Sequence, residues 1–144
     1  MGLKKPLPTK KIPSKIKMKE NHRIKQAIID FVKGGDTSDV ELLDKVLHKD
    51  FRVTNNGFMG TSGITIVTKN EYLNKIKSGV FGGLPRQLEI LEIDQSGKIA
   101  SVKLRIESAE NDFISYNSFV LDADKEWKLI NNLAVVKSKK NELK

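Results

Sequence analysis

Residues 99–108 read IASVKLRIES, and in this segment apolar and polar side chains alternate. On an extended chain, Ala100, Val102, Leu104 and Ile106 share one face and the polar residues between them share the other. This period of two predicts a strand with one buried and one exposed face. Residues 87–94, 113–121 and 127–136 are expected to form further strands, joined by short turns. Such connections predict an antiparallel meander.

The residues before this meander follow a helical period instead. A first helix is expected from near residue 19 to the Gly34-Gly35 pair, with an apolar face formed by Ile24, Ala27, Ile28, Phe31 and Val32. A short helix at 40–48, a strand starting at 51–54 and a β-branched run at 64–67 follow. Thr68 and Glu71 read as a capping box that opens a third helix ending near residue 79. Helices packed on one face of a sheet define an α+β fold.

The net charge of +8 is concentrated at the two ends of the 144-residue chain. Residues 1–19 hold seven lysines and no acidic residue, and residues 137–144 hold four lysines against one glutamate. The segment between them has 15 basic and 17 acidic residues, so it is almost neutral. We therefore expect a basic, proline-containing flexible arm at 1–19, a folded domain at 20–136 and a basic tail at 137–144.

The composition excludes several classes of site. The chain has no cysteine, which removes disulfides, thiolate metal sites and cysteine nucleophiles. Two histidines, His22 and His48, are too few for a histidine-based metal site without carboxylates. No apolar run is long enough to span a bilayer, and the first residues lack the apolar segment of a signal peptide. We expect no cofactor, no metal, no membrane association and a cytoplasmic location.

The order of these elements, together with four local strings, resembles one superfamily. The strings are Gly34-Gly35-Asp36, Leu47-His48-Lys49-Asp50-Phe51, the helix 70–76 (NEYLNKI) and the strand 126–132 (EWKLINN). In this order they are similar to the nuclear transport factor 2-like superfamily, and within it to the branches called putative lumazine-binding and SnoaL-like. The resemblance covers roughly residues 20–136.

The resemblance implies a cone-shaped α+β barrel. In this architecture a curved antiparallel sheet wraps around about three N-terminal helices, a pocket opens at the wide end, and homodimers form through the sheet. Ketosteroid isomerase-like members place a catalytic tyrosine on the first helix, where this chain has Phe31 and no tyrosine. Dehydratase-like members use a histidine and carboxylates in a tyrosine-rich pocket, and this chain has only two tyrosines. We therefore favour binding of a small apolar or aromatic molecule without catalysis.

Large aromatic side chains and polar interruptions of apolar faces are the candidate ligand-binding residues. Asn131 interrupts the expected face of Trp127, Leu129, Leu133 and Val135, and Ser115 and Asn117 interrupt that of Phe113, Phe119 and Leu121. A buried amide needs a hydrogen-bond partner, which a ligand, water or a dimer interface could supply. The candidates are Phe31, Phe51, Phe58, Tyr72, Tyr116, Asn117, Trp127 and Asn131.

Two alternatives remain open. His48 and Asp50 stand two residues apart and could share one side of an extended segment, which would suit a lyase or isomerase with a His–Asp pair in the cone. A helix-end histidine and a surface turn explain the same residues. The lysine-rich tails could instead make the chain a protein- or polyanion-binding adaptor, although the first tail lacks the arginines and aromatics that stack on bases, which makes nucleic acid an unfavoured partner.

Overall fold

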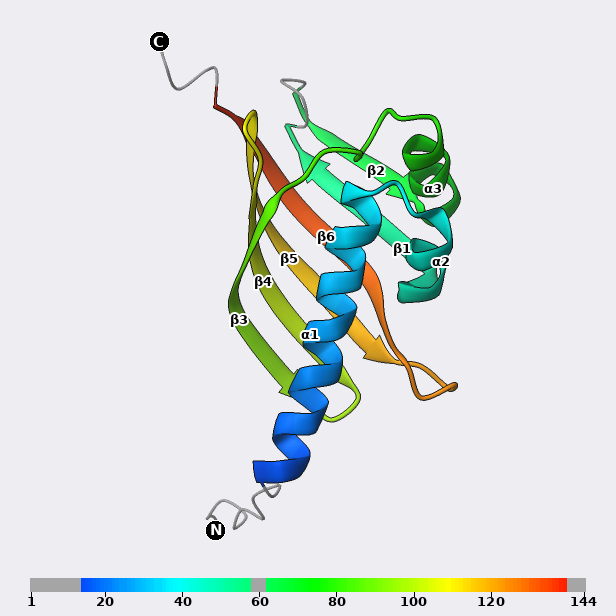
Figure 1. Ribbon diagram of the computed structural model, residues 1–144, viewed down its shortest axis with the longest axis vertical. Helices are drawn as coiled ribbons and strands as arrows, with labels where there is room; N and C mark the ends of the chain where they lie inside the picture. Colours follow the sequence, from blue (N-terminus) through cyan, green and yellow to red (C-terminus); the bar gives the residue numbers. More distant parts are fainter. Residues whose placement is uncertain (1–13, 58–61, 140–144) are drawn as a thin grey trace.

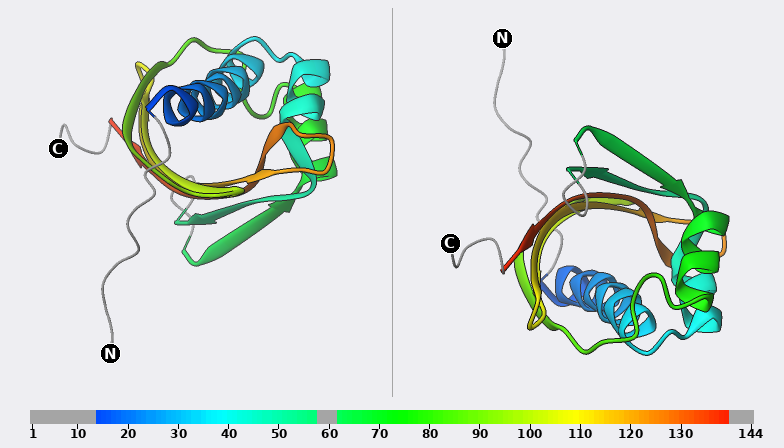
Figure 2. Two further views of the ribbon diagram at one scale, coloured as in Figure 1. Left: turned by 90° about the horizontal axis from the view of Figure 1, so that it is seen from below. Right: turned by 90° about the horizontal axis from the view of Figure 1, so that it is seen from above.

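The computed structural model describes residues 14–57 and 62–139 (Figure 1). In chain order the elements are α1 (Ser14–Asp36), α2 (Val40–Val46), β1 (Leu47–Asn56), β2 (Ile64–Thr68), α3 (Lys69–Lys77), β3 (Gln87–Ser96), β4 (Ile99–Glu107), β5 (Asn111–Leu121) and β6 (Trp127–Ser138). The sheet curls around α1, while α2 and α3 lie beside β1 (Figure 2). The predicted α+β class is confirmed.

The sheet is mixed rather than entirely antiparallel. Its strand order is β2-β1-β6-β5-β4-β3, and β3 to β6 form the predicted antiparallel meander. The correction concerns β1, which pairs with β6 in parallel. This parallel contact places the end of the first strand beside the end of the last, so residues far apart in sequence share one wall of the interior.

The first helix differs from its prediction at both ends. It begins at Ser14 instead of near residue 19, and it continues through Gly34 and Gly35 to Asp36. A β-carbon on Gly34 would lie 2.7 Å from a Leu43 side-chain carbon, so this glycine allows α1 and α2 to pack closely. The left-handed residue after the helix is Ser38, with φ of 54°. The glycine pair therefore serves packing inside the helix and does not end it.

The core forms between α1 and the concave face of the sheet. The predicted apolar face of α1 is buried, and so are the four alternating residues of β4. Phe51 of β1 is only 1% exposed and joins the two groups near α3. Full burial of one such side chain contributes about 1.5–3 kcal/mol of stabilising free energy.

A β-bulge in β6 overturns the predicted face of that strand. Phe119 pairs with Leu129, but Ser118 pairs with Asn131, so Ile130 is an extra residue in β6. Residues before the bulge that face the core are Trp127 and Leu129, and those after it are Asn132, Ala134 and Val136. The prediction that Asn131, Leu133 and Val135 share the face of Trp127 is therefore wrong, since all three are exposed.

The segment between α3 and β3 crosses over the end of α1. Gly83 donates its N–H to the carbonyl oxygen of Gly35 at 2.9 Å. Gly82 has φ of +73°, and a β-carbon there would lie far inside van der Waals contact of the same carbonyl oxygen. Only glycine fits this crossing without displacing the backbone.

We expect Gly82→Ala to destabilise the fold more than Gly79→Ala does. Gly79 also has a positive φ, of +79°, but a β-carbon there meets nothing within 4 Å. The control substitution thus carries only the left-handed strain of about 1–2 kcal/mol, and Gly82→Ala adds a backbone clash. Urea unfolding of the two variants measures the difference. Equal unfolding free energies would contradict this account of the crossing.

Candidate functional site

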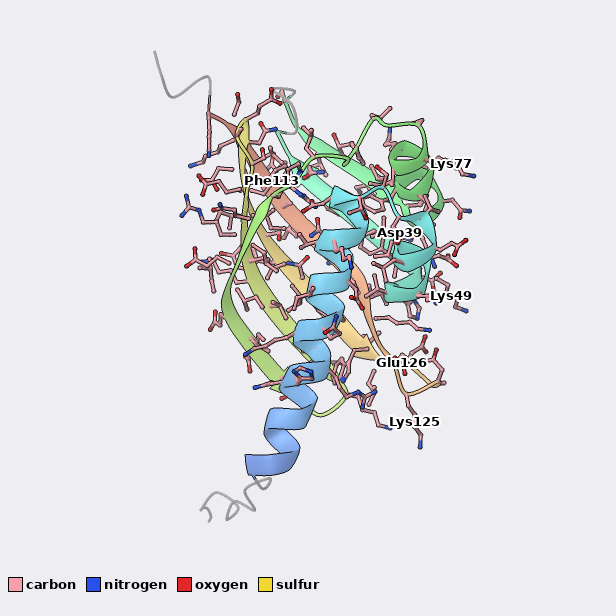
Figure 3. All side chains as sticks on the ribbon, in the orientation of Figure 1. Asp39, Lys49, Lys77, Phe113, Lys125 and Glu126 are labelled. Carbon is pink, nitrogen blue, oxygen red and sulfur yellow. The ribbon has the colours of Figure 1, made fainter. Side chains whose placement is uncertain are left out.

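A cavity of about 290 Å³ opens at one end of the curved sheet, between the sheet, α1, α3 and the 80–86 segment. Phe113, on its sheet side, lies toward the opposite end of the molecule from Lys125 and Glu126 (Figure 3). Most of the side chains that line the cavity are apolar or aromatic. Besides Gly35 and Gly82, the lining residues are Phe31, Val53, Asn55, Tyr72, Ile76, Val80, Phe81, Leu84, Arg86, Ile106, Ser108, Glu110, Asn111, Phe113, Ser115, Asn132, Ala134 and Val136.

Aromatic rings form the helical wall of this pocket. Phe31 of α1 and Tyr72 of α3 stack with ring centroids 6.2 Å apart, and Phe81 lies 6.0 Å from Tyr72. Phe51 supports this wall from behind, in edge contacts of 6.3 Å with Phe31 and 5.6 Å with Tyr72. Such a fixed aromatic surface offers the face of a flat ligand ring a stacking partner.

Arg86 and Asp36 form an ion pair at the rim. The Nε of Arg86 donates to Asp36 Oδ1 at 2.5 Å, and its backbone N–H donates to Asp36 Oδ2 at 3.2 Å. Both side chains are largely buried, and the guanidinium also lies 5.7 Å from the ring centroid of Phe113. This pair ties the 80–86 segment to the end of α1 and thereby fixes one edge of the pocket.

Polar side chains gather on the sheet side, opposite the aromatic wall. Asn132 Nδ2 donates to Asn117 Oδ1 at 2.5 Å, and Asn117 Nδ2 donates to Ser115 Oγ at 3.0 Å and to the Val102 carbonyl at 3.3 Å. We call Ser115, Asn117 and Asn132 the amide triad. Ser115 and Asn132 line the pocket, whereas Asn117 lies behind them at 1% exposure.

The structure brings together only some of the candidate ligand-binding residues. Phe31 and Tyr72 line the pocket, and Phe51 and Asn117 lie directly behind its walls. Trp127 is buried but does not line the pocket.

Three further candidates lie elsewhere or outside the description. Tyr116 and Asn131 are exposed on the outer face of the sheet, Asn131 because of the bulge at Ile130. Phe58 lies outside the described residues. Ligand binding by the candidates that do line the cavity remains a proposal.

His48 and Asp50 are not among the residues that line the pocket. His48 Nδ1 accepts the backbone N–H of Asp50 at 3.0 Å, and the Asp50 carboxylate lies 3.9 Å from the same nitrogen. Asp50 is 69% exposed. Neither residue of the His–Asp pair that the lyase or isomerase alternative required therefore lines this pocket, and the two make a local contact with each other at the start of β1.

Sequence reasoning missed several pocket residues for identifiable reasons. Asn55 follows Phe51 and Val53 on the inward face of β1, so a longer strand prediction would have found it. The alternating pattern of β6 did not indicate Asn132, because the bulge at Ile130 reverses the inward and outward faces of the residues that follow it. Arg86 lies in a segment without a periodic pattern. Its position at the pocket depends on the tertiary ion pair with Asp36.

A family model described as "Putative lumazine-binding" matches residues 19–133. The match spans most of the chain, and the chain belongs to this family. A sequence comparison with curated proteins finds no match.

The fold itself recurs in many solved structures. A nuclear transport factor 2-like protein of unknown function from Silicibacter pomeroyi has a TM-score of 0.74 at 10% identity, over 84% of this chain and 98% of that chain. A similar protein from Shewanella baltica gives 0.72 at 16% identity, over 83% and 95%. A ketosteroid isomerase-like protein from Erwinia carotovora atroseptica gives 0.67 at 16% identity, over 81% and 95%. The nuclear transport factor 2-like fold expected from the sequence is thereby confirmed.

None of the helices in residues 14–57 and 62–139 is long and apolar enough to cross a membrane.

The phenol of Tyr72 should titrate unusually late. Burial raises its pKa to about 12, Asp36 acts in the same direction, and Arg86 opposes the shift. The chain has two tyrosines, so in Tyr116→Phe the phenolate absorbance reports Tyr72 alone. We expect a midpoint near pH 12.

The raised pKa of Tyr72 also makes the stability of the fold depend on pH at alkaline pH. The raised pKa favours the neutral phenol in the folded chain, so its stabilising contribution is complete below pH 10 and is lost as the pH rises toward about 12. Tyr72→Phe should lack this alkaline component in denaturant unfolding. A Tyr72 midpoint at pH 10 or below would show that the ring is not buried as described.

Proposed function

We propose that this chain binds a small, flat, apolar or aromatic molecule in the pocket and does not itself carry out catalysis. The observation that carries the proposal is an aromatic wall of Phe31, Tyr72 and Phe81 facing polar groups on the sheet across an open cavity. Ligand sites have this composition: mostly apolar walls with a few placed polar groups. The cavity of about 290 Å³ is near the lower end for such sites, which favours a ligand of one or two rings.

Membership of the family described as "Putative lumazine-binding" makes lumazine the first probe to use. Lumazine is a fused two-ring compound, so its size and flatness suit the proposed ligand class. Titration calorimetry of the full chain with lumazine gives the affinity, and thermal unfolding with and without the compound gives an independent measure.

We expect Ala134→Phe to weaken lumazine binding at least about tenfold, because the larger side chain would occupy space in the pocket that Ala134 lines. Ser101→Phe is the matched control, since Ser101 lies on β4 with its side chain on the exposed face. The control should bind as the unmodified chain does. Equal affinities of the two variants for lumazine would contradict the proposal.

We further propose that a second copy of the chain covers the outer face of the sheet. Ile66, Thr54, Leu133 and Tyr116 stand side by side on neighbouring strands. Ile66, Leu133 and Tyr116 are 58%, 46% and 51% exposed, and Ile64 and Val135 extend the apolar area. The next position along the row is Lys103, whose Nζ lies 5.4 Å from the ring centroid of Tyr116 and so borders the patch. The apolar part, centred on Ile66 and Leu133, can pack on its own copy around a two-fold axis.

Leu133→Lys should convert the proposed dimer to a monomer, because each copy would bury an ammonium group near the two-fold axis. Asn74→Lys, on the exposed side of α3, adds the same charge away from the patch and should leave the dimer intact. Light scattering after size-exclusion chromatography measures the mass. An unmodified chain that is monomeric at all concentrations would refute this assembly without affecting the ligand proposal.

A further inference from the structure

The hydrogen-bond donors and acceptors of the amide triad have a fixed orientation. The carbonyl oxygen of Val102 can only accept a hydrogen bond, so the atom of Asn117 that lies 3.3 Å from it must be the nitrogen. The Asn117 oxygen then faces Asn132. Because that oxygen can only accept, the Asn132 atom 2.5 Å away must also be a nitrogen. One backbone carbonyl thus determines both amide orientations.

This orientation leaves one acceptor and one donor of the triad without a hydrogen-bond partner among the described residues. No described residue donates to Asn132 Oδ1, and none accepts the hydroxyl proton of Ser115, whose oxygen is already an acceptor for Asn117. Among the described residues, every fully buried side-chain nitrogen or oxygen has a hydrogen-bond partner. Asn132 Oδ1 is therefore accessible, and the accessible space beside it is the pocket that Asn132 and Ser115 line.

The pocket wall therefore presents an acceptor and a donor on neighbouring strands. Asn117 fixes the positions of both side chains. It lies opposite Asn132 on the neighbouring strand and hydrogen-bonds to it, and it also hydrogen-bonds to Ser115, two residues earlier on its own strand. An N–H beside a carbonyl is one group that satisfies both, since it donates to the amide oxygen and accepts from the hydroxyl. Within a flat ring, this combination is the edge of a cyclic amide, or lactam.

We propose that the pocket selects flat ring compounds that carry a lactam edge. Asn132 Oδ1 accepts the ring N–H, Ser115 donates its hydroxyl proton to the adjacent ring carbonyl, and the ring lies against the aromatic wall. The inference rests on the proposed function and adds the chemical class of the ligand. A site that desolvates two such groups rejects an analogue that leaves one of them unpaired.

The test compares 2-quinolinone with N-methyl-2-quinolinone, which differ only in the ring N–H. Titration calorimetry with the full chain should give 2-quinolinone an affinity at least about tenfold higher, because the methylated compound leaves Asn132 Oδ1 without a donor. Equal affinities would overturn the lactam inference while leaving a flat-ligand pocket in place.

Two variants separate the hydrogen bonds from the shape of the pocket. Asn132→Leu should abolish the preference for 2-quinolinone over its N-methyl analogue. Ser115→Ala should weaken both compounds about three- to tenfold, since both keep the carbonyl. Ser101→Ala, on the exposed face of β4, should change neither affinity.

Thermal unfolding shows whether each variant remains folded. Should Asn132→Leu fail to fold, Ser115→Ala remains decisive, because it leaves the Asn117 contact with Val102 in place. An unchanged 2-quinolinone affinity in Ser115→Ala would overturn the inference. Lumazine binding without binding of either quinolinone would also overturn it, whereas failure of all three compounds would overturn the proposed function as well.

Discussion

The extra residue in β6, Ile130, determines which side chains the last strand directs into the molecule. Before it, Trp127 and Leu129 close the core, and after it Asn132 and Ala134 line the pocket. Without the bulge, the alternation would direct Leu133 and Val135 inward and Asn132 outward. The bulge therefore exchanges a second apolar layer for an open cavity with a polar wall, and it leaves apolar side chains on the outer face of the sheet.

This exchange has an energetic consequence. Directing Leu133 and Val135 outward gives up apolar burial, while an amide turned inward must recover its lost hydration through hydrogen bonds. The amide triad does so within the sheet, through Asn117 and the Val102 carbonyl. On the helical side of the pocket, Phe31, Phe51 and Tyr72 pack in mutual contact, and their burial offsets part of the apolar burial given up by Leu133 and Val135. A rigid, partly polar cavity results from these two supports.

Local patterns were sufficient to predict most of the fold. The alternation in β4 and the helical period of α1 were confirmed residue by residue, and the capping box of α3 forms as expected between Thr68 and Glu71. The parallel pairing of β1 with β6 was not predictable from local pattern, because it joins segments about eighty residues apart. Among the residues that line the pocket, Phe31 and Tyr72 were chosen as candidates from residue type alone. Asn132 and Arg86 depend on a bulge and on a tertiary ion pair, which leave no periodic signal.

A crystal structure of the chain with 2-quinolinone tests the central claim most directly. We expect the ring in the pocket, with its face toward Tyr72, its nitrogen within hydrogen-bond distance of Asn132 Oδ1 and its oxygen within that distance of Ser115 Oγ. A cavity filled by the protein's own side chains, or a ring bound elsewhere on the chain, would contradict it.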